Sequence, residues 1–196
     1  LPKEVLKSLR ELAGTDGKSS RKPLLVEFFT LSDEEVVVFL VPLWEETPPV
    51  VERVKVERGA VRQMADSLSE ATNKLTPETR ARLGGNERAV SPQERQAAQR
   101  QFARLLTEMD ALVQPWARHL DEWQPTFLVL SPHFLLNLLP LHAAIWKGKP
   151  LIEHYPVVYL PSPALVHEIL KQRKPLTGEA LLLGNPTKDL TGAEQA

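Results

Sequence analysis

The sequence TFLVL at residues 126–130, followed by Ser131-Pro132, decides the fold. It is a short, continuous apolar run, which is typical of a strand buried on both faces of a parallel sheet. Two further runs of this kind follow at residues 157–160 and 180–183, and a helix that opens at Ser162-Pro163 separates them. This order of strand, helix and strand predicts a βαβ-type unit and therefore an α/β fold.

Upstream of this unit, the sequence predicts an antiparallel β meander. Residues 24–31, 35–41 and 50–57 are three β-like runs joined by short connections. Short connections favour antiparallel pairing. The third run alternates apolar and charged residues, which indicates a strand with one face in water.

Helical spacing of apolar residues predicts helices over residues 2–12 and 60–75. Another helix begins sharply at Ser91, because Ser91-Pro92-Gln93-Glu94 has the form of a capping box with proline at the first helical position. Pro115 is unfavourable inside a helix, so we predict a break at Gln114-Pro115 and a second helix that carries Trp116. The helix after Ser162 is expected to turn four apolar residues towards the core: Leu165, Val166, Ile169 and Leu170.

The composition is that of an ordinary globular protein and limits the possible functions. Hydrophobic residues make up 42% of the 196 residues and charged residues 25%, with a net charge of −1. This balance argues against a role dominated by nucleic acid or by an anionic membrane surface. The chain has no apolar run of membrane-spanning length, no secretory signal and no cysteine, so we expect a cytoplasmic location, no disulfides and no thiolate metal site.

Several short motifs follow one another in a fixed order from residue 102 onwards. They are the proline at 115 between helical stretches, the strand ending in Pro132, LLPLHAA at 138–144, PLIEHYPVVYLPS at 150–162, LLLGNP at 181–186 and LTGAE at 190–194. Together they resemble the first half of CHAT domains, the caspase-like domains that often follow tetratricopeptide repeats in bacteria. The paired strands predicted from residue 24 are also similar to those that open these domains, so the resemblance extends over most of residues 24–196.

The resemblance implies a fold and a division of the chain. The fold is a caspase-like three-layer α-β-α core, incomplete because only its first strands are present, preceded by the β meander and helices. Residues 1–23 would form an N-terminal helix and flexible linker. Residues 24–124 would form the N-terminal part of the CHAT-like domain, with a mobile loop at 76–90, and residues 125–196 the first half of the α/β core.

The resemblance places the catalytic residues outside the sequence. In the family, the catalytic histidine belongs to a His-Gly pair after the next core strand, and the catalytic cysteine follows the strand after that. Neither region is present before Ala196, so no catalytic residue is transferred to this chain. The residues expected to line the cleft at the strand ends are His133, Asn185 and Asp189.

Other chemistry has weak support in the sequence. The five histidines form no HxxxH or HExxH pair, and a Cys–His dyad has no cysteine to use. His133 and His142 bracket an apolar loop, but we expect each to hydrogen-bond a neighbouring backbone group rather than a metal. Ser131 lies at a strand end without a G-x-S-x-G elbow, so it is interpreted as a strand terminator rather than a nucleophile.

Two loops were also considered as binding sites. The sequence GNPTK at 184–188 follows a strand but lacks the spacing of a phosphate-binding loop, so it is interpreted as a turn. The basic residues in the loop at 76–90 are interpreted as solvated, with a protease-sensitive or partner-binding loop as the alternative; they are Arg80, Arg82 and Arg88.

Two functions compete. In the first, this chain is the scaffold and one cleft wall of a caspase-like cysteine endopeptidase and is inactive by itself. Its partners would be the C-terminal half of the same protein, a polypeptide substrate and an upstream helical-repeat region, with no cofactor or metal. In the second, the chain is a non-catalytic, caspase-like interaction or regulatory module whose open sheet edge accepts a partner protein. An unrelated hydrolase that uses serine or a metal is a third, weaker hypothesis.

Overall fold

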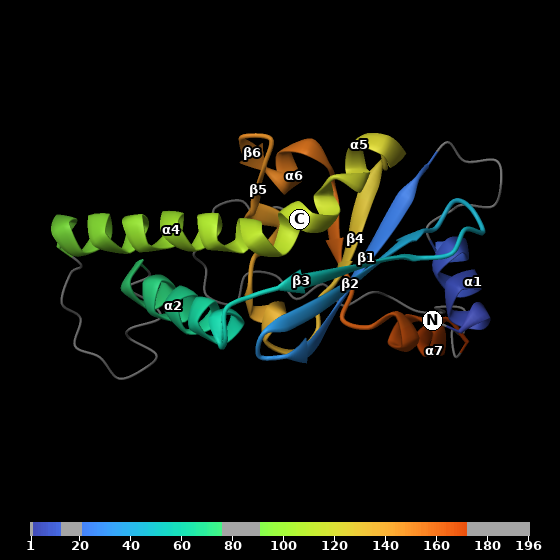
Figure 1. Ribbon diagram of the computed structural model, residues 1–196, viewed down its shortest axis with the longest axis horizontal. Coiled ribbons are helices and arrows are strands. Elements are labelled where there is room, and N and C mark those ends of the chain that lie inside the picture. Colours follow the sequence, from blue (N-terminus) through green and yellow to red (C-terminus); the bar gives the residue numbers. More distant parts are fainter. Residues whose placement is uncertain (1, 13–20, 76–90, 172–196) are drawn as a thin grey trace, which may run out of the picture.

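The computed structural model of the chain describes residues 2–12, 21–75 and 91–171 (Figure 1). In these ranges five strands form one mixed sheet in the order β3-β2-β1-β4-β7. The strands of this sheet are β1 (Pro23–Ser32), β2 (Glu35–Pro42), β3 (Val50–Lys55), β4 (Phe127–Ser131) and β7 (Val157–Tyr159). The helices are α1 (Lys3–Leu12), α2 (Ala60–Leu75), α4 (Pro92–Ala117), α5 (His119–Trp123), α6 (Leu151–His154), α7 (Pro163–Lys171) and the 3-10 turns η1 (Phe134–Leu138) and η2 (Leu141–Ala143).

The meander and the α/β core share this one sheet. β1 pairs antiparallel with β2, and β2 pairs antiparallel with β3, as the sequence predicts. On its other side β1 pairs in parallel with β4, which in turn pairs in parallel with β7. The first strand of the meander is therefore the central strand of the sheet, joined to a strand about a hundred residues later.

Helices cover both faces, and the three-layer α-β-α arrangement is thus confirmed (Figure 1). On one side, here called the closed face, α2, α4 and α5 pack with η1 and η2 over the larger apolar cluster. On the other side, here called the half-open face, α1 and α7 lie side by side over a smaller cluster. Successive β1 residues alternate between the faces: Leu24, Val26 and Phe28 belong to the larger cluster, and Leu25 belongs to the smaller one.

The predicted helix break at Pro115 is wrong. α4 runs through Pro115 to Ala117, and α5 follows after Arg118. Pro115 lies in the last turn and cannot donate to the carbonyl four residues before it, so its presence inside the helix has a cost. Trp116 is fully buried, packs edge-on against Phe28 at a centroid distance of 6.0 Å and donates its indole N–H to the Leu112 carbonyl at 2.9 Å. This packing offsets the cost of an internal proline.

The start of α4 agrees with the sequence. The Ser91 side chain accepts from the Glu94 N–H at 3.2 Å, and the Glu94 carboxylate accepts from the Ser91 N–H at 2.8 Å. This reciprocal capping box anchors a helix that extends well beyond the sheet beside α2 (Figure 1).

The segment between β4 and β7 contains a small hairpin of β5 (Ile145–Trp146) and β6 (Lys149–Pro150). Its turn residues, Lys147 and Gly148, both have positive φ, as a tight primed turn requires. Two contacts fix the hairpin to α4: the Ile145 N–H donates to Asp110 at 2.7 Å, and Gln114 donates to the Ile145 carbonyl at 3.0 Å.

The expected inner face of α7 is wrong in part. Val166 packs against the smaller apolar cluster, whereas Leu165 and Ile169 are exposed. Ser8 of α1 contacts His167 of α7 at 2.9 Å, so this side of α7 faces α1. Helical periodicity identified an apolar helix but not which apolar residues the neighbouring elements cover.

Among the described residues, no helix combines the length and apolarity that crossing a membrane would need.

Candidate functional site at the carboxyl edge of the sheet

The parallel strands β4 and β7 end at one edge of the sheet, and the side chains there form the candidate site. In open α/β sheets, ligands bind outside the carboxyl ends of the strands. Ser131 is the last residue of β4, and Tyr159 is the last residue of β7. His133 follows β4 directly, and His142 reaches the end of β7 from η2.

His133 is held against the end of the central strand. Its ring stacks on Phe29 of β1 at a centroid distance of 4.7 Å and an interplanar angle of 21°. The Thr30 backbone N–H donates to His133 Nδ1 in a long hydrogen bond of 3.4 Å. This agrees with the expectation that His133 hydrogen-bonds a neighbouring backbone group. The next residue, Phe134, is exposed and has a φ of 53°, a conformation uncommon for a residue with a side chain. His133 thus lies at a sharp, solvent-facing turn.

His142 pairs with a residue that the sequence analysis did not select. The Tyr159 hydroxyl accepts the His142 backbone N–H at 3.1 Å and lies 3.0 Å from His142 Nδ1, to which it can donate its proton. The expected bond from His142 to a backbone group is therefore wrong, because its ring contacts a phenol. Burial raises the pKa of Tyr159, so the hydroxyl keeps its proton near neutral pH.

Ser131 has the surroundings of a structural residue. Its exposed fraction is 3%, and its register partner on β1 is Glu27. The histidines of this edge bind elsewhere, His133 to Thr30 and His142 to Tyr159, so neither is arranged as a base for Ser131. This geometry agrees with the interpretation of Ser131 as a strand terminator.

Glu27 is the acidic group of this region. It lies on the half-open face between Phe39 of β2 and Ser131 of β4. Burial raises the pKa of its carboxyl group. None of the described side chains forms a hydrogen bond or ion pair with it.

Several predicted positions lie outside the described residues. They include Asn185 and Asp189 of the predicted cleft, the GNPTK turn, the predicted strand at 180–183 and the arginines of the loop at 76–90. Their role in the site stays a prediction. Within the described ranges, no group of three or more His, Asp or Glu side chains could hold a metal ion.

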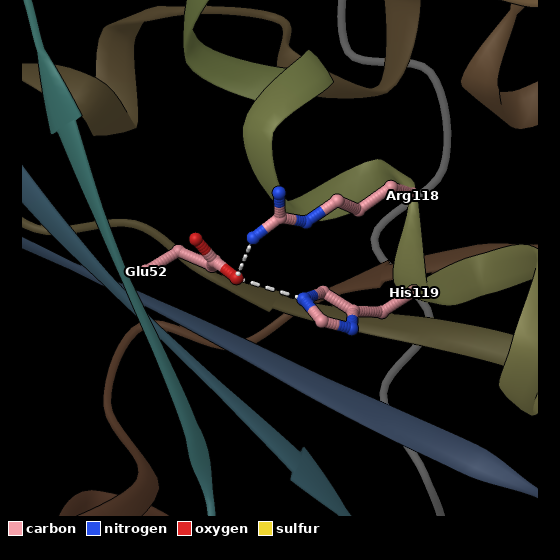
Figure 2. A network of polar contacts seen from close by, with 3 residues as sticks. All are labelled: Glu52, Arg118 and His119. Carbon is pink, nitrogen blue, oxygen red and sulfur yellow. Dashed lines mark hydrogen bonds and ion pairs between the residues drawn. The ribbon is translucent and has the colours of Figure 1, made fainter.

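A second polar cluster includes a residue of β3, the edge strand on the other side of the sheet from β7 (Figure 2). One carboxylate oxygen of Glu52 lies 2.7 Å from Arg118 and 2.8 Å from His119, at the junction of α4 and α5. His119 also stacks on Trp123 at 5.3 Å. The hydrogen bond from His119, with that from Arg118, lowers the pKa of Glu52 despite its burial. The cluster fastens the edge strand to the helices of the closed face.

A groove of about 750 Å³ lies elsewhere, between α1 and the loop after β2. Its charged lining residues are Lys3, Lys7, Arg10, Glu11 and Glu46. None of the groove residues belongs to the carboxyl edge. Arg10 crosses the groove and donates to the Glu45 carbonyl at 2.6 Å, so the groove is partly occupied by the chain itself.

Comparison with known proteins identifies the C-terminal half of the chain. Residues 100–195 match the CHAT domain family. The matched range begins within α4 and includes β4, β7 and the carboxyl edge, whereas β1 to β3 precede it. No curated protein matches the chain. The match confirms the resemblance to the CHAT domain over residues 100–195, and that family is caspase-like and related to peptidases.

Proposed function

We propose that this chain is the N-terminal scaffold and one cleft wall of a caspase-like cysteine endopeptidase. In this proposal the catalytic histidine and cysteine come from sequence beyond Ala196, and the 196 residues are inactive by themselves. The substrate is a polypeptide, and the remaining partners are the catalytic half of the protein and a helical-repeat region upstream of α1.

The match of residues 100–195 to the CHAT domain carries the proposal. The sequence itself supports the need for a second segment, because it contains no cysteine to act as nucleophile. The arrangement of β1, β4 and β7 supports the placement of the cleft, because parallel strands deliver their loops to one edge. His133 and the His142–Tyr159 pair would then line the wall of the cleft.

The proposal is tested on the natural protein. Intact mass measurement and peptide mapping across Ala196 establish whether the chain continues through a His-Gly pair to a cysteine. The natural protein is then incubated with a broad peptide library, with and without a thiol-alkylating reagent. We expect cleavage that alkylation abolishes, and none from the 196-residue chain alone. A natural protein that contains both catalytic residues but cleaves no peptide would contradict the proposal.

A second candidate is a non-catalytic, caspase-like interaction module, and one observation favours it. Within the described residues β7 is an edge strand, and Val158 on this strand is 52% exposed. Leu165 and Ile169 on the following helix are also exposed. An open edge with apolar neighbours can accept a further strand. A natural chain that ends at Ala196 and assembles with another protein would favour this module over the peptidase.

A further inference from the structure

His142 lies on an anchored turn at the carboxyl edge of the sheet. It belongs to η2, and its neighbours Leu141 and Ala144 are fully buried. The Leu151 N–H of α6 donates to the Ala144 carbonyl at 3.0 Å, which fastens the end of the turn to the next helix. The backbone that carries the imidazole is therefore held in place by the fold itself.

The hydrogen bonds around the Tyr159 hydroxyl determine where its proton goes. The hydroxyl oxygen accepts the His142 backbone N–H at 3.1 Å, and the Leu141 backbone N–H also contributes to this bonding. A ring N–H of His142 aimed at the same oxygen would compete with these backbone donors. It would also leave the phenol proton without an acceptor among the described groups. The contact of 3.0 Å with His142 Nδ1 is therefore made by the phenol proton.

This direction of the hydrogen bond determines which nitrogen of His142 carries hydrogen. Since Nδ1 accepts, the ring hydrogen of the neutral imidazole lies on Nε2. Within the described ranges Nε2 of His142 has no hydrogen-bond partner, and the residue is half-buried rather than enclosed. The ring therefore offers one N–H donor, and no acceptor, to a group that binds beside it.

We infer that Tyr159 holds His142 in the tautomer with hydrogen on Nε2, and that this N–H binds a backbone carbonyl oxygen of the polypeptide substrate. The second part rests on the proposed function, which supplies the ligand. Ligands of open α/β sheets bind outside the carboxyl ends of the strands, and Tyr159 ends β7. Carbonyl oxygens are the repeated neutral acceptors of a polypeptide, and a neutral donor matches them without a buried charge. His142 is then a binding residue, and Tyr159 is its positioning residue.

The tautomer is tested on the 196-residue chain and needs no peptidase activity. Long-range proton–nitrogen NMR spectra of the chain with isotopically labelled histidine, at about pH 8, show which ring nitrogen carries hydrogen. We expect His142 to carry it on Nε2 alone, and Tyr159→Phe to give both tautomers in exchange. His154 is the internal control, because its Nε2 lies 2.9 Å from the Trp146 carbonyl, which can only accept, so its signals should not change. Hydrogen on Nδ1 of His142, or a His142 spectrum unchanged by Tyr159→Phe, would overturn the inference.

The ligand is tested on the natural protein with a peptide that it cleaves. His142→Gln keeps an amide N–H near the position of Nε2, whereas the shorter side chain of His142→Asn does not reach it. We expect kcat/KM to fall about fivefold in His142→Asn and to be largely restored in His142→Gln, as one neutral hydrogen bond would produce.

A second series of substrates separates this bond from a structural effect. The carbonyls of the peptide are replaced one at a time by thiocarbonyls, which are weaker acceptors. One position should slow wild type and cause no further loss in His142→Asn. Equal kcat/KM for wild type and His142→Asn, or no carbonyl position whose effect depends on His142, would overturn the carbonyl as ligand. A natural protein that cleaves no peptide would overturn the proposed function and the carbonyl with it, and the NMR spectra would still decide the tautomer.

Discussion

The two faces of the central strand differ, although both are built from the same ten residues of β1. On the closed face, Leu24, Val26 and Phe28 are almost fully buried, and burial falls only beyond them, at Thr30 and Ser32. On the half-open face, burial falls along the strand from Leu25 to the half-buried Glu27 and the exposed Phe29. The strand is therefore a core element on one side and partly a surface on the other.

This difference predicts which side of the sheet contributes more to stability. The closed face contains most of the buried apolar side chains, including Trp116 between α4 and the sheet. The half-open face contains a smaller cluster and the half-buried Glu27. Substitutions on the closed face should therefore cost more stability than substitutions on the half-open face.

The largest effect is expected at the centre of the closed face. Trp116→Ala removes a fully buried indole and its contact with Phe28, and should lower the free energy of unfolding by about 3–5 kcal/mol. Phe134→Ala at the exposed carboxyl edge is the control and should change it by less than about 0.5 kcal/mol. Urea unfolding followed by circular dichroism measures both. Equal losses for the two variants would show that the closed face does not dominate stability.

The elements of both faces could be predicted from local patterns. The strands of the meander, the capping box at Ser91 and the buried run at residues 126–130 all depend on neighbours in sequence. The failure at Pro115 has the opposite origin. A local rule predicted a break, and burial of Trp116 against distant Phe28 outweighed it.

The contacts of the site were less predictable, because they join residues far apart in sequence. Tyr159 meets His142 through the pairing of β7 with β4, and Glu52 meets His119 through the packing of β3 under α4. Nothing in the spacing of these residues indicates either contact. His133 was selected correctly as a residue of the strand end, but its stacking on Phe29 depends on the parallel pairing of β1 with β4.

A smaller effect is expected where the edge strand is fastened to the closed face. Glu52→Gln should lower the free energy of unfolding at pH 7 by about 1–2 kcal/mol, because it weakens the hydrogen bonds to Arg118 and His119. The pKa of Glu52 is lowered from 4.5, so this stabilisation is complete above pH 4.5 and is lost as the pH falls through the lowered value.

The pH series is measured by urea unfolding of wild type and variant at each pH. Glu35→Gln serves as the matched control, because Glu35 pairs with Arg53, whose side chain is largely exposed. It should cost less than about 0.5 kcal/mol. A Glu52 effect that stays constant from pH 7 to pH 3 would contradict the role assigned to its charge.

At the carboxyl edge, Tyr159→Phe should cost about 1 kcal/mol, because it removes the hydroxyl that bonds to His142 and leaves the ring in place. A double-mutant cycle with His142→Ala isolates this contact. We expect the two losses to be non-additive. Strict additivity would mean that the phenol and the imidazole act independently.

The smallest effect is expected on the half-open face, and its sign is opposite to that at Glu52. Burial raises the pKa of Glu27 above 4.5. Between pH 4.5 and the raised pKa, the folded state binds more protons than the unfolded state, so wild-type stability falls as the pH rises through this range. Glu27→Gln should therefore be neutral at pH 4 and more stable than wild type by about 0.5 kcal/mol at pH 7, by urea unfolding. A loss of stability at pH 7 would mean that the carboxylate is satisfied within the chain. A gain would show that the desolvation of Glu27 outweighs its favourable interactions within the chain.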